Sequence, residues 1–361
     1  MTCAPPRAPR ISAALTTVDQ LLAEGLADPA DGPGLQAVAE TFRIRLTPEM
    51  RAVAEAPGVA AQFVPTLAEA VIRPGELADP IGDHAFSPAP GLTHRYPDRV
   101  ILAATQTCEV YCRFCFRRET VGSDGALSMP ELDLALDHIR RHPAIWEVIL
   151  TGGDPLSLSP RRVTALLARL AEIDHVQVIR FHTRVPVVAP ERITEDLLAA
   201  FDIRPAVHLV LHTNHPDELT PAACAALRRL NRAGVPLLSQ TVLLKGVNAE
   251  AAVLERLFRA LVQNRVKPYY LHHCDLAKGT SHFRTTIAEG QAIMAQLRGR
   301  LSGMCLPTYV LDIPGGAGKV PIGPGYLAPG EGPGQYRVTD WQGRVHDYDD
   351  PRPADQCPAD Q

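Results

Sequence analysis

Three cysteines lie close together in the segment that runs from Thr105 to Gly122. Cys108, Cys112 and Cys115 are separated by gaps of three and two residues. Thiolates are preferred ligands of four-iron clusters, and three of them on one short loop would leave one iron open to a ligand that the protein does not supply. A structural zinc site normally needs four protein ligands, and no second pair at zinc spacing accompanies this loop. The spacing therefore favours an iron–sulfur cluster, and zinc is unlikely.

The remaining cysteines are scattered singly along a chain of 361 residues: Cys3, Cys224, Cys274, Cys305 and Cys357. Disulfide frameworks belong to short secreted chains, so this pattern argues against one. No apolar run approaches the roughly 18 residues of a membrane helix, and the first residues lack the apolar core of a secretory signal. A net charge of −4 gives no reason to expect nucleic acid as a partner. We therefore expect a cytoplasmic protein without a membrane partner.

Short apolar runs alternate with amphipathic stretches from about Val100 onward. The strand candidates are residues 99–105, 147–153, 176–183, 206–213, 236–244, 267–273 and 307–312. The helix candidates between them are residues 129–142, 159–173, 194–201, 219–234, 250–264 and 287–300. This alternation predicts an α/β fold with a parallel sheet and right-handed crossovers, closed or partly closed into a barrel. We expect this core at 94–313, after helices and loops at 1–93 and before a loop-rich segment at 314–361 that contains one hairpin.

Polar residues gather where the predicted strands end. The cysteine loop follows the first strand, and the segments TGGDP, HTNHPDE, HHCDLAKG and IPGGAGK follow four others. The last of these resembles a phosphate-binding loop, but Ile313 stands at the first glycine position and Val320 follows Lys319, so the motif does not match. Because active sites of barrel folds lie at the carboxyl ends of the strands, we expect these segments to form one site.

The cysteine spacing, with the aromatic Phe114 before the last cysteine, resembles the signature of the radical S-adenosylmethionine (SAM) superfamily. From about Phe63 to the tail, the chain resembles the lysine 2,3-aminomutase family within it. The motifs that carry this resemblance are LTHRYPDRV, YCRFCFRR, LTGGDPL, HCDLAKGTSHFRT and YVLDIPGGAGKVP. The resemblance implies a partial (β/α)6-type radical SAM barrel. It also implies a [4Fe-4S] cluster on the three cysteines, whose open iron binds SAM and cleaves it to a 5′-deoxyadenosyl radical.

The family's cofactor sites can be carried onto matching positions. Lys319 takes the place of the lysine that holds pyridoxal 5′-phosphate as a Schiff base, which supplies an electron sink for the radical. The glycines before it let the backbone approach the cofactor closely. The segment with Arg95, Tyr96 and Arg99 is expected near the pyridoxal ring and phosphate, although an ion pair is an alternative for Arg99. The residues expected to contact SAM are Phe114, Gly152, Gly153 and Asp154. Further ligand contacts are expected from His212, Asn214 and His215.

The substrate groups follow from the same matching. Arg117 takes the family's carboxylate-binding position, a task that suits the planar guanidinium. Asp275 and Asp312 match the two aspartates that hold a terminal ammonium, which favours L-lysine. A like charge at about 4 Å costs on the order of 4 kcal/mol at an effective dielectric near 20, so two ionised aspartates would reject a glutamate side chain. The resemblance thus implies an isomerase that converts L-lysine to β-lysine.

The chain departs from the family's lysine enzyme at three points. Cys357 stands alone where that enzyme has clustered cysteines for zinc, the internal cysteine of that zinc site aligns near Glu250, and His272 replaces a tyrosine. In its short length and in His272, this chain resembles the branch of the family that makes β-lysine for elongation factor P. That branch, however, generally lacks the paired aspartates. Alternatives are therefore that branch, an aminomutase for another amino acid, and a non-catalytic iron–sulfur or zinc protein. A reductant such as flavodoxin or ferredoxin is expected as a partner, and the oligomeric state is left open.

Overall fold

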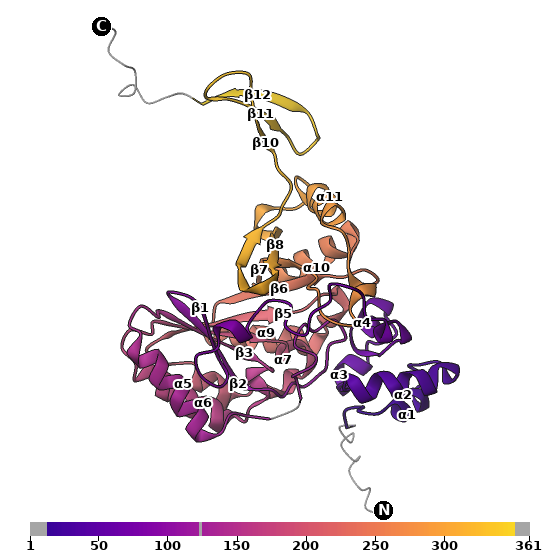
Figure 1. The fold of residues 1–361 in the computed structure, drawn as a ribbon, viewed down its shortest axis with the longest axis vertical. Helices are drawn as coiled ribbons and strands as arrows, with labels where there is room; N and C mark the ends of the chain where they lie inside the picture. Colours follow the sequence, from indigo (N-terminus) through magenta and orange to yellow (C-terminus); the bar gives the residue numbers. More distant parts are fainter. Residues whose placement is uncertain (1–12, 123–124, 351–361) are drawn as a thin grey trace, which may run out of the picture.

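The computed structural model describes residues 13–122 and 125–350, and a nine-stranded sheet dominates it (Figure 1). The strands are hydrogen-bonded in sequence order from β1 to β9. Seven of them run parallel: β2 (Arg99–Thr105), β3 (Glu147–Gly152), β4 (Val178–Thr183), β5 (Ala206–His212), β6 (Leu237–Leu243), β7 (Lys267–His273) and β8 (Thr308–Ile313). These seven strands are the ones predicted from the sequence, and the α/β fold is confirmed.

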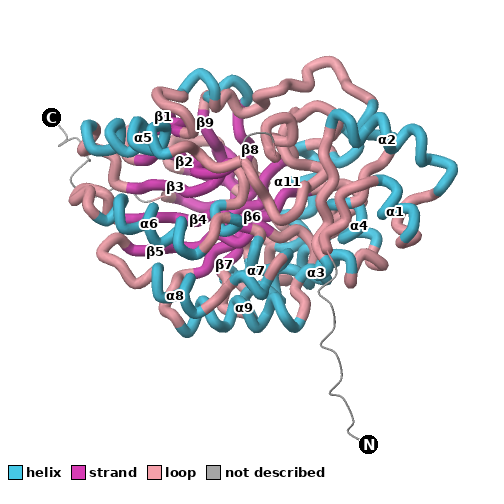
Figure 2. The backbone as a smooth tube through the Cα atoms, turned by 90° about the horizontal axis from the view of Figure 1, so that it is seen from below, coloured by secondary structure: helices cyan, strands magenta, loops and turns pink. Residues whose placement is uncertain are grey.

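Two short antiparallel strands flank the parallel sheet and were not predicted. The strand β1 (Leu92–Tyr96) pairs with β2, and β9 (Gly318–Pro321) pairs with β8. The sheet thus extends beyond both ends of the expected 94–313 core, and Lys319 belongs to it. Figure 2 shows the strands gathered in the middle of the molecule with the helices around them.

The helices connect the parallel strands on the outer side of the sheet. They are α5 (Met129–Arg141), α6 (Pro160–Ala171), α7 (Val185–Val188), α8 (Glu195–Ala200), α9 (Pro221–Arg232), α10 (Ala251–Gln263) and α11 (Ile287–Leu297). The start of α5 is fixed locally, because Ser128 and Glu131 form a capping box that satisfies exposed backbone N–H groups. Within the described residues, none of the helices combines the length and the apolar character needed to cross a membrane.

The described part of the amino-terminal extension, residues 13–93, contains four short α-helices: α1 (Val18–Ala23), α2 (Gly32–Thr41), α3 (Pro48–Arg51) and α4 (Pro57–Phe63). It is bonded to the cysteine loop through the backbone. The N–H of Tyr111 donates to the carbonyl of Arg45 over 3.0 Å, and the N–H of Arg113 donates to the carbonyl of Gln62 over 2.8 Å. The extension therefore supports the loop that carries the three cysteines.

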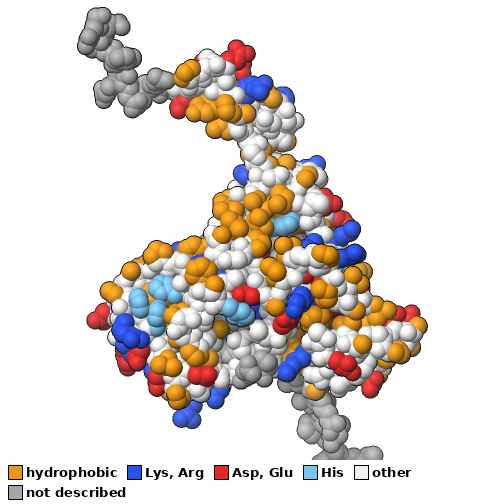
Figure 3. Space-filling view, viewed as in Figure 1, with side chains coloured by type: hydrophobic (Ala, Val, Ile, Leu, Met, Phe, Trp, Pro, Cys, Tyr) orange, Lys and Arg blue, Asp and Glu red, His pale blue; other side chains and the backbone are white. Residues whose placement is uncertain are grey.

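A second, three-stranded antiparallel sheet follows the barrel and stands away from it at the top of Figure 1. It consists of β10 (Leu327–Pro329), β11 (Gln335–Thr339) and β12 (Val345–Asp349). The predicted hairpin is present as β11 and β12. Several apolar side chains of this small sheet are exposed, among them Leu327, Val345 and Tyr348 (Figure 3).

Candidate active site

A cavity of about 760 Å³ occupies the interior of the barrel. It begins at the cysteine loop, passes the carboxyl ends of β3 and β4, and extends to the opposite end of the sheet at Arg99 and Glu147. The lining includes most of the residues selected from the sequence: Arg95, Tyr96, Arg99, Cys108, Cys112, Phe114, Cys115, Arg117, Gly152, Gly153, Asp154, His212, Asp275, Asp312 and Lys319. A cavity of this size is typical of sites for cofactors and small ligands.

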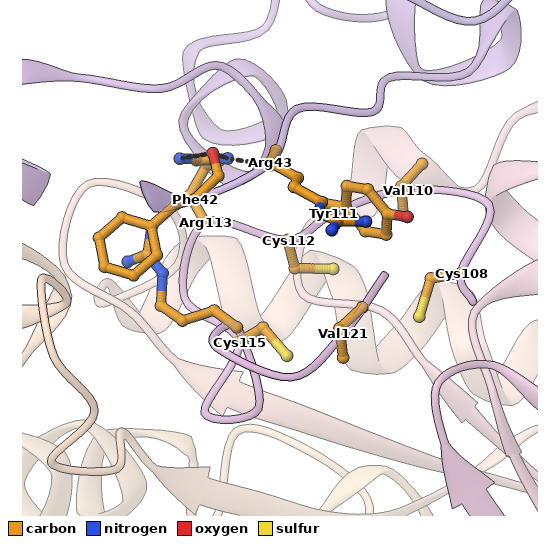
Figure 4. Close-up of a pocket in the computed structure, with 10 residues that line it drawn as sticks. Phe42, Arg43, Cys108, Val110, Tyr111, Cys112, Arg113, Cys115 and Val121 are labelled. Carbon is orange, nitrogen blue, oxygen red and sulfur yellow. Dashed lines mark hydrogen bonds between the residues drawn. The ribbon is translucent and has the colours of Figure 1, made fainter. Parts of the chain in front are cut away.

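The three cysteines line a second, small pocket of about 40 Å³ (Figure 4), and they also line the large cavity. Phe42 and Tyr111 form part of its other walls. Burial raises the pKa of all three thiols, so they bind as thiolates where a metal cation compensates the charge. Among the described residues, no three His, Cys, Asp or Glu side chains are grouped so that they could hold a single metal ion. Three thiols spread around a pocket fit a multi-iron cluster.

The arginines beside these cysteines have different partners. Arg113 and Arg118 both bind the carboxylate of Glu69, which lies in the amino-terminal extension and is fully buried. Burial would raise the pKa of Glu69, but the two guanidinium groups hold it below its ordinary value. Arg113 also donates to the carbonyl of Arg43 over 2.8 Å. These two arginines therefore brace the loop, whereas Arg117 faces the large cavity.

The segment after β3 lies directly against the cysteine loop. Gly152 has φ +103°, and a side chain there would collide with Ala103. A Cβ on Gly153 would lie 2.5 Å from the carbonyl oxygen of Thr107. Glycine is required at both positions, because a side chain would push the end of β3 away from β2 at Gly152 and away from the cysteine loop at Gly153.

Asp154 is held tightly by protein groups. Its carboxylate accepts hydrogen bonds from the Thr183 hydroxyl and the Arg184 backbone N–H, both over 2.7 Å, and from the Leu156 N–H over 3.0 Å. Asp154 thus ties the end of β3 to the end of β4 at the edge of the cavity. The direct contact with SAM predicted for it stays a prediction.

The predicted His212, Asn214 and His215 separate into two groups. His212 lines the cavity, lies against Phe114, and has a buried Nε2 without a partner. Asn214 and His215 are not among the cavity-lining residues. The Asn214 amide is bonded to Gln62 and to the backbone of Val242. The Nδ1 of His215 accepts the N–H of Asp217 and caps a 3-10 helix. These two residues stabilise the turn after β5, and the geometry gives no support for a ligand contact.

Lys319 projects from β9 into the cavity. Its ammonium forms an ion pair with Asp312 and lies 3.3 Å from Nδ1 of His272. His272 in turn lies 3.2 Å from the same carboxylate. Burial would raise the pKa of Asp312, but His272 and Lys319 together hold it well below its ordinary value. Asp312 is therefore a permanent negative charge beside the lysine.

Asp275 is the second carboxylate of this group. Burial, together with the charge of Asp312, raises its pKa to about 7, against the opposing effects of Lys319 and Arg117. Because the charge of Lys319 balances that of Asp312, this end of the site is negatively charged when Asp275 is ionised. The pairing of Asp275 with Asp312 that the sequence suggested is present in the geometry.

Arg95 and Arg117 share a partner that sequence reasoning missed. Asp83 accepts from Nη2 of Arg95 over 3.0 Å and from Nη2 of Arg117 over 2.7 Å. Arg99 instead pairs with Asp98 over 2.7 Å and stacks on the ring of Tyr96 at 3.8 Å. The ion pair that was an alternative for Arg99 is thus present, and Arg99 also lines the cavity.

Other cavity residues were not among those selected from the sequence. His182 on β4 is half-buried, its buried Nε2 has no hydrogen-bond partner among the described residues, and desolvation lowers its pKa well below the ordinary value, so the ring is neutral. Arg180 and Glu147 form an ion pair of 2.9 Å inside the barrel. Alternation along β4 places Arg180 and His182 on the same face of the strand, and this was the one available indication.

Two family models match the chain: the radical SAM superfamily over residues 102–257 and lysine-2,3-aminomutase over residues 294–361. The L-lysine 2,3-aminomutase of Fusobacterium nucleatum is 40% identical over 323 residues, which cover 88% of this chain and 76% of that protein. The enzyme of the same name from Acetoanaerobium sticklandii is 39% identical, with 93% and 82% covered. The glutamate 2,3-aminomutase of Clostridioides difficile is 40% identical, with 76% and 65% covered.

Overall identity thus does not separate lysine-named from glutamate-named relatives, and the substrate has to be argued from the site. The lysine and glutamate enzymes share the reaction class and the radical cofactors. The chain is therefore an isomerase with a [4Fe-4S] cluster and SAM. It belongs to the lysine 2,3-aminomutase family of the radical SAM superfamily.

Proposed function

We propose that this enzyme converts L-lysine to β-lysine by moving the amino group between adjacent carbons. The observation that carries the proposal is the arrangement of charges in the barrel cavity. Asp275 and Asp312 form a negative end, and Arg117 supplies a positive group in the same cavity. A substrate with a carboxylate at one end and an ammonium at the other matches both.

The negative end favours lysine over glutamate. Asp312 stays ionised because Lys319 and His272 stabilise its charge. A second carboxylate at about 4 Å from Asp312 would be repelled by about 4 kcal/mol at an effective dielectric of 20, whereas an ammonium would be attracted by a similar amount. The proposed specificity therefore rests on the two aspartates.

Arg117 suits the substrate carboxylate because its guanidinium is only partly occupied. Asp83 binds one of its nitrogens, and its plane lies over the ring of Phe116 at 4.3 Å. Arg117 lines the cavity, and the nitrogens that Asp83 does not bind could donate two parallel hydrogen bonds to a carboxylate there.

Pyridoxal phosphate fits the donor set around Lys319. The lysine amine lies in the cavity, with the Tyr270 ring at 5.5 Å and the unpartnered Nε2 atoms of His182 and His272 among the lining groups. Arg95 on the edge strand β1 and Arg99 at the start of β2 are suited to hold a phosphate. Bound through Lys319, the cofactor would supply an electron sink for the migrating amino group. Asp312 would then stay ionised and stabilise the protonated Lys319 amine, and His272, which lies beside both groups, would take up the proton that the amine gives up.

The proposal includes three finer expectations. The electron that cleaves SAM comes from a one-electron carrier such as flavodoxin or ferredoxin, and the protein works in the cytoplasm. His272, which replaces a tyrosine of the lysine enzymes, resembles the elongation factor P branch, which is the alternative to free β-lysine metabolism as the pathway that uses the product. The retained aspartates favour free L-lysine as the substrate.

The test is anaerobic turnover with reconstituted cluster, SAM, pyridoxal phosphate and a reductant, with the product separated by chiral chromatography. We expect β-lysine from the wild-type enzyme. Asp312→Asn should lose turnover of lysine while iron content and SAM cleavage are retained. Full cluster and SAM cleavage without any β-lysine would refute lysine as the substrate, and ornithine, arginine and glutamate would then be tried.

A further inference from the structure

Asp83 lies outside every motif that identifies the family, yet it connects two residues of the site. Its two carboxylate oxygens are divided between two arginines: Oδ1 accepts from Arg95 on β1, and Oδ2 accepts from Arg117 after the last cysteine. The Asp83 side chain is 15% exposed, and those of Arg95 and Arg117 are 12% and 19% exposed. Ion pairs this sheltered are screened little by solvent.

The segment around Asp83 is itself held in place. Asp79 accepts the backbone N–H groups of Asp83 and His84, both over 2.9 Å. Arg95 donates to the carbonyl of Ile81 over 2.7 Å, which fixes the chain just before Asp83. The carboxylate of Asp83 is therefore presented by a backbone that has little freedom to move.

The same segment contacts the loop that leads to Lys319. Gly82 has φ +69°, and a Cβ there would lie 2.5 Å from the carbonyl carbon of Gly315. Residues 79–86 thus lie against the lysine loop, the edge strand β1 and the cysteine loop at once. A residue at the junction of these three elements is placed to set their relative position.

We propose that Asp83 is a positioning residue for substrate binding: it holds the guanidinium of Arg117 toward the cavity so that it can take the substrate's carboxylate. The inference rests on the proposed function, because it assigns that carboxylate to Arg117. Asp83 binds a single nitrogen of Arg117, so the remaining donors stay available, and the side chain loses less conformational entropy when the substrate binds.

The opposite role, competition with the substrate for Arg117, predicts the opposite result. If Asp83 competes, removal of its charge makes L-lysine bind more tightly. If it positions Arg117, removal makes L-lysine bind more weakly. The sign of the change in KM therefore decides between the two roles.

The experiment compares wild type with Asp83→Asn and Asp83→Glu as fully reconstituted enzymes. Asp83→Asn should raise the KM for L-lysine about tenfold, as expected for a charge-assisted contact, and change kcat less than about threefold. Asp83→Glu should recover part of the loss. Cadaverine, which keeps both amines but lacks the carboxylate, should inhibit wild type and Asp83→Asn about equally. A substitution that merely disrupts the site would weaken the binding of both L-lysine and cadaverine.

Asp137→Asn is the matched control. Asp137 on α5 also binds one nitrogen of an arginine, Arg140 at 2.7 Å, but on the exposed outer surface. It should leave KM and kcat unchanged. A double-mutant cycle with Arg117→Lys then tests the route of the effect: Asp83→Asn should add little to the loss of L-lysine binding in that background, measured from the cofactor's absorbance change.

The outcomes separate the two hypotheses. If wild type neither turns over nor binds L-lysine, the proposed function fails. Two results would refute the role of Asp83 in an active enzyme. One is a KM for L-lysine that is unchanged or lower in Asp83→Asn. The other is binding of cadaverine that is weakened as much as binding of L-lysine. Equal iron content in all variants verifies that the cluster loop is intact.

Discussion

The backbone N–H of Lys319 donates a hydrogen bond of 3.0 Å to the phenolic oxygen of Tyr96. Tyr96 ends β1 and Lys319 lies in β9, so one side chain joins the two antiparallel edges of the sheet. Gly318, with φ +103°, permits this approach, because a Cβ there would lie 2.9 Å from the same oxygen. The position of the candidate cofactor lysine thus depends on Tyr96.

Replacement of Tyr96 by phenylalanine should weaken the hold on the cofactor. The lost hydrogen bond contributes about 0.5–1.5 kcal/mol, so the Kd for pyridoxal phosphate should rise by a few-fold to about tenfold. Absorbance titration of the cluster-loaded protein measures this. Tyr348→Phe, on the exposed face of β12, is the control. Equal affinity in Tyr96→Phe and wild type would show that the bond between the sheet edges is dispensable.

Binding of L-lysine should depend on pH through Asp275. Its pKa of about 7 means that it is mostly ionised at pH 8 and mostly protonated at pH 6. The charged groups around it are Asp312, Lys319, Arg117 and Asp83. The KM for L-lysine should therefore rise by about tenfold as the pH falls from 8 to 6. The same measurement on Asp275→Asn should give a high KM without this slope, and a slope that persists there would assign the titration to another group.

The raised pKa of Asp275 also has a consequence for stability. The folded state holds the proton up to about pH 7, whereas the unfolded chain releases it near the ordinary value of 3.8. Stability contributed by the protonated form is thus present at low pH and lost as the pH rises toward 7, by up to about 1.4 kcal/mol per pH unit. Urea unfolding of wild type and Asp275→Asn at pH 5 and pH 7 should show the variant gaining relative stability at pH 7. An equal difference at both values would contradict the raised pKa.

Glu69 should be essential for the cysteine loop, although it touches no cofactor site directly. Glu69→Gln would leave Arg113 and Arg118 buried without a compensating charge, and removal of one partner from a buried ion pair costs about 3–5 kcal/mol. We expect a lower unfolding midpoint and a reduced iron content after reconstitution. Exposed Glu172, which follows α6, serves as the control for the same substitution. Normal iron content in Glu69→Gln would show that the loop does not need this bracing.

The alternation of apolar runs was enough to predict the parallel sheet, because buried parallel strands read as continuous apolar segments. The edge strands β1 and β9 were not predicted because they lack such continuous apolar segments. The strand β1 is short and carries His94, Arg95 and Tyr96, and β9 is only four residues long and contains glycine and proline. Their pairing depends on the rest of the sheet, and local sequence does not encode it.

The candidate site was predictable where motifs follow the strand ends, as with Cys108, Asp312 and Lys319. Asp83 was missed because it lies in a Pro/Gly-rich connector far from the cysteine loop in sequence, and only folding brings it to Arg117. Arg113 and Arg118 could not be distinguished from Arg117 by type or spacing. Their burial against Glu69 makes the difference. Asn214 and His215 show that polar residues after a strand can also bond to the turn itself, which the sequence pattern does not distinguish from a ligand contact.

We propose that Asp275 and Asp312 select a substrate with a terminal ammonium. The most direct measurement is the ratio of kcat/KM for L-lysine over L-glutamate, determined in one reconstituted preparation and repeated with Asp275→Asn and with Asp312→Asn. A carboxylate facing ionised Asp312 is disfavoured by about 4 kcal/mol, so wild type should prefer L-lysine by about a thousandfold, and each substitution should reduce that ratio sharply. Comparable turnover of the two amino acids by wild type, or a ratio unchanged in both variants, would contradict the claim.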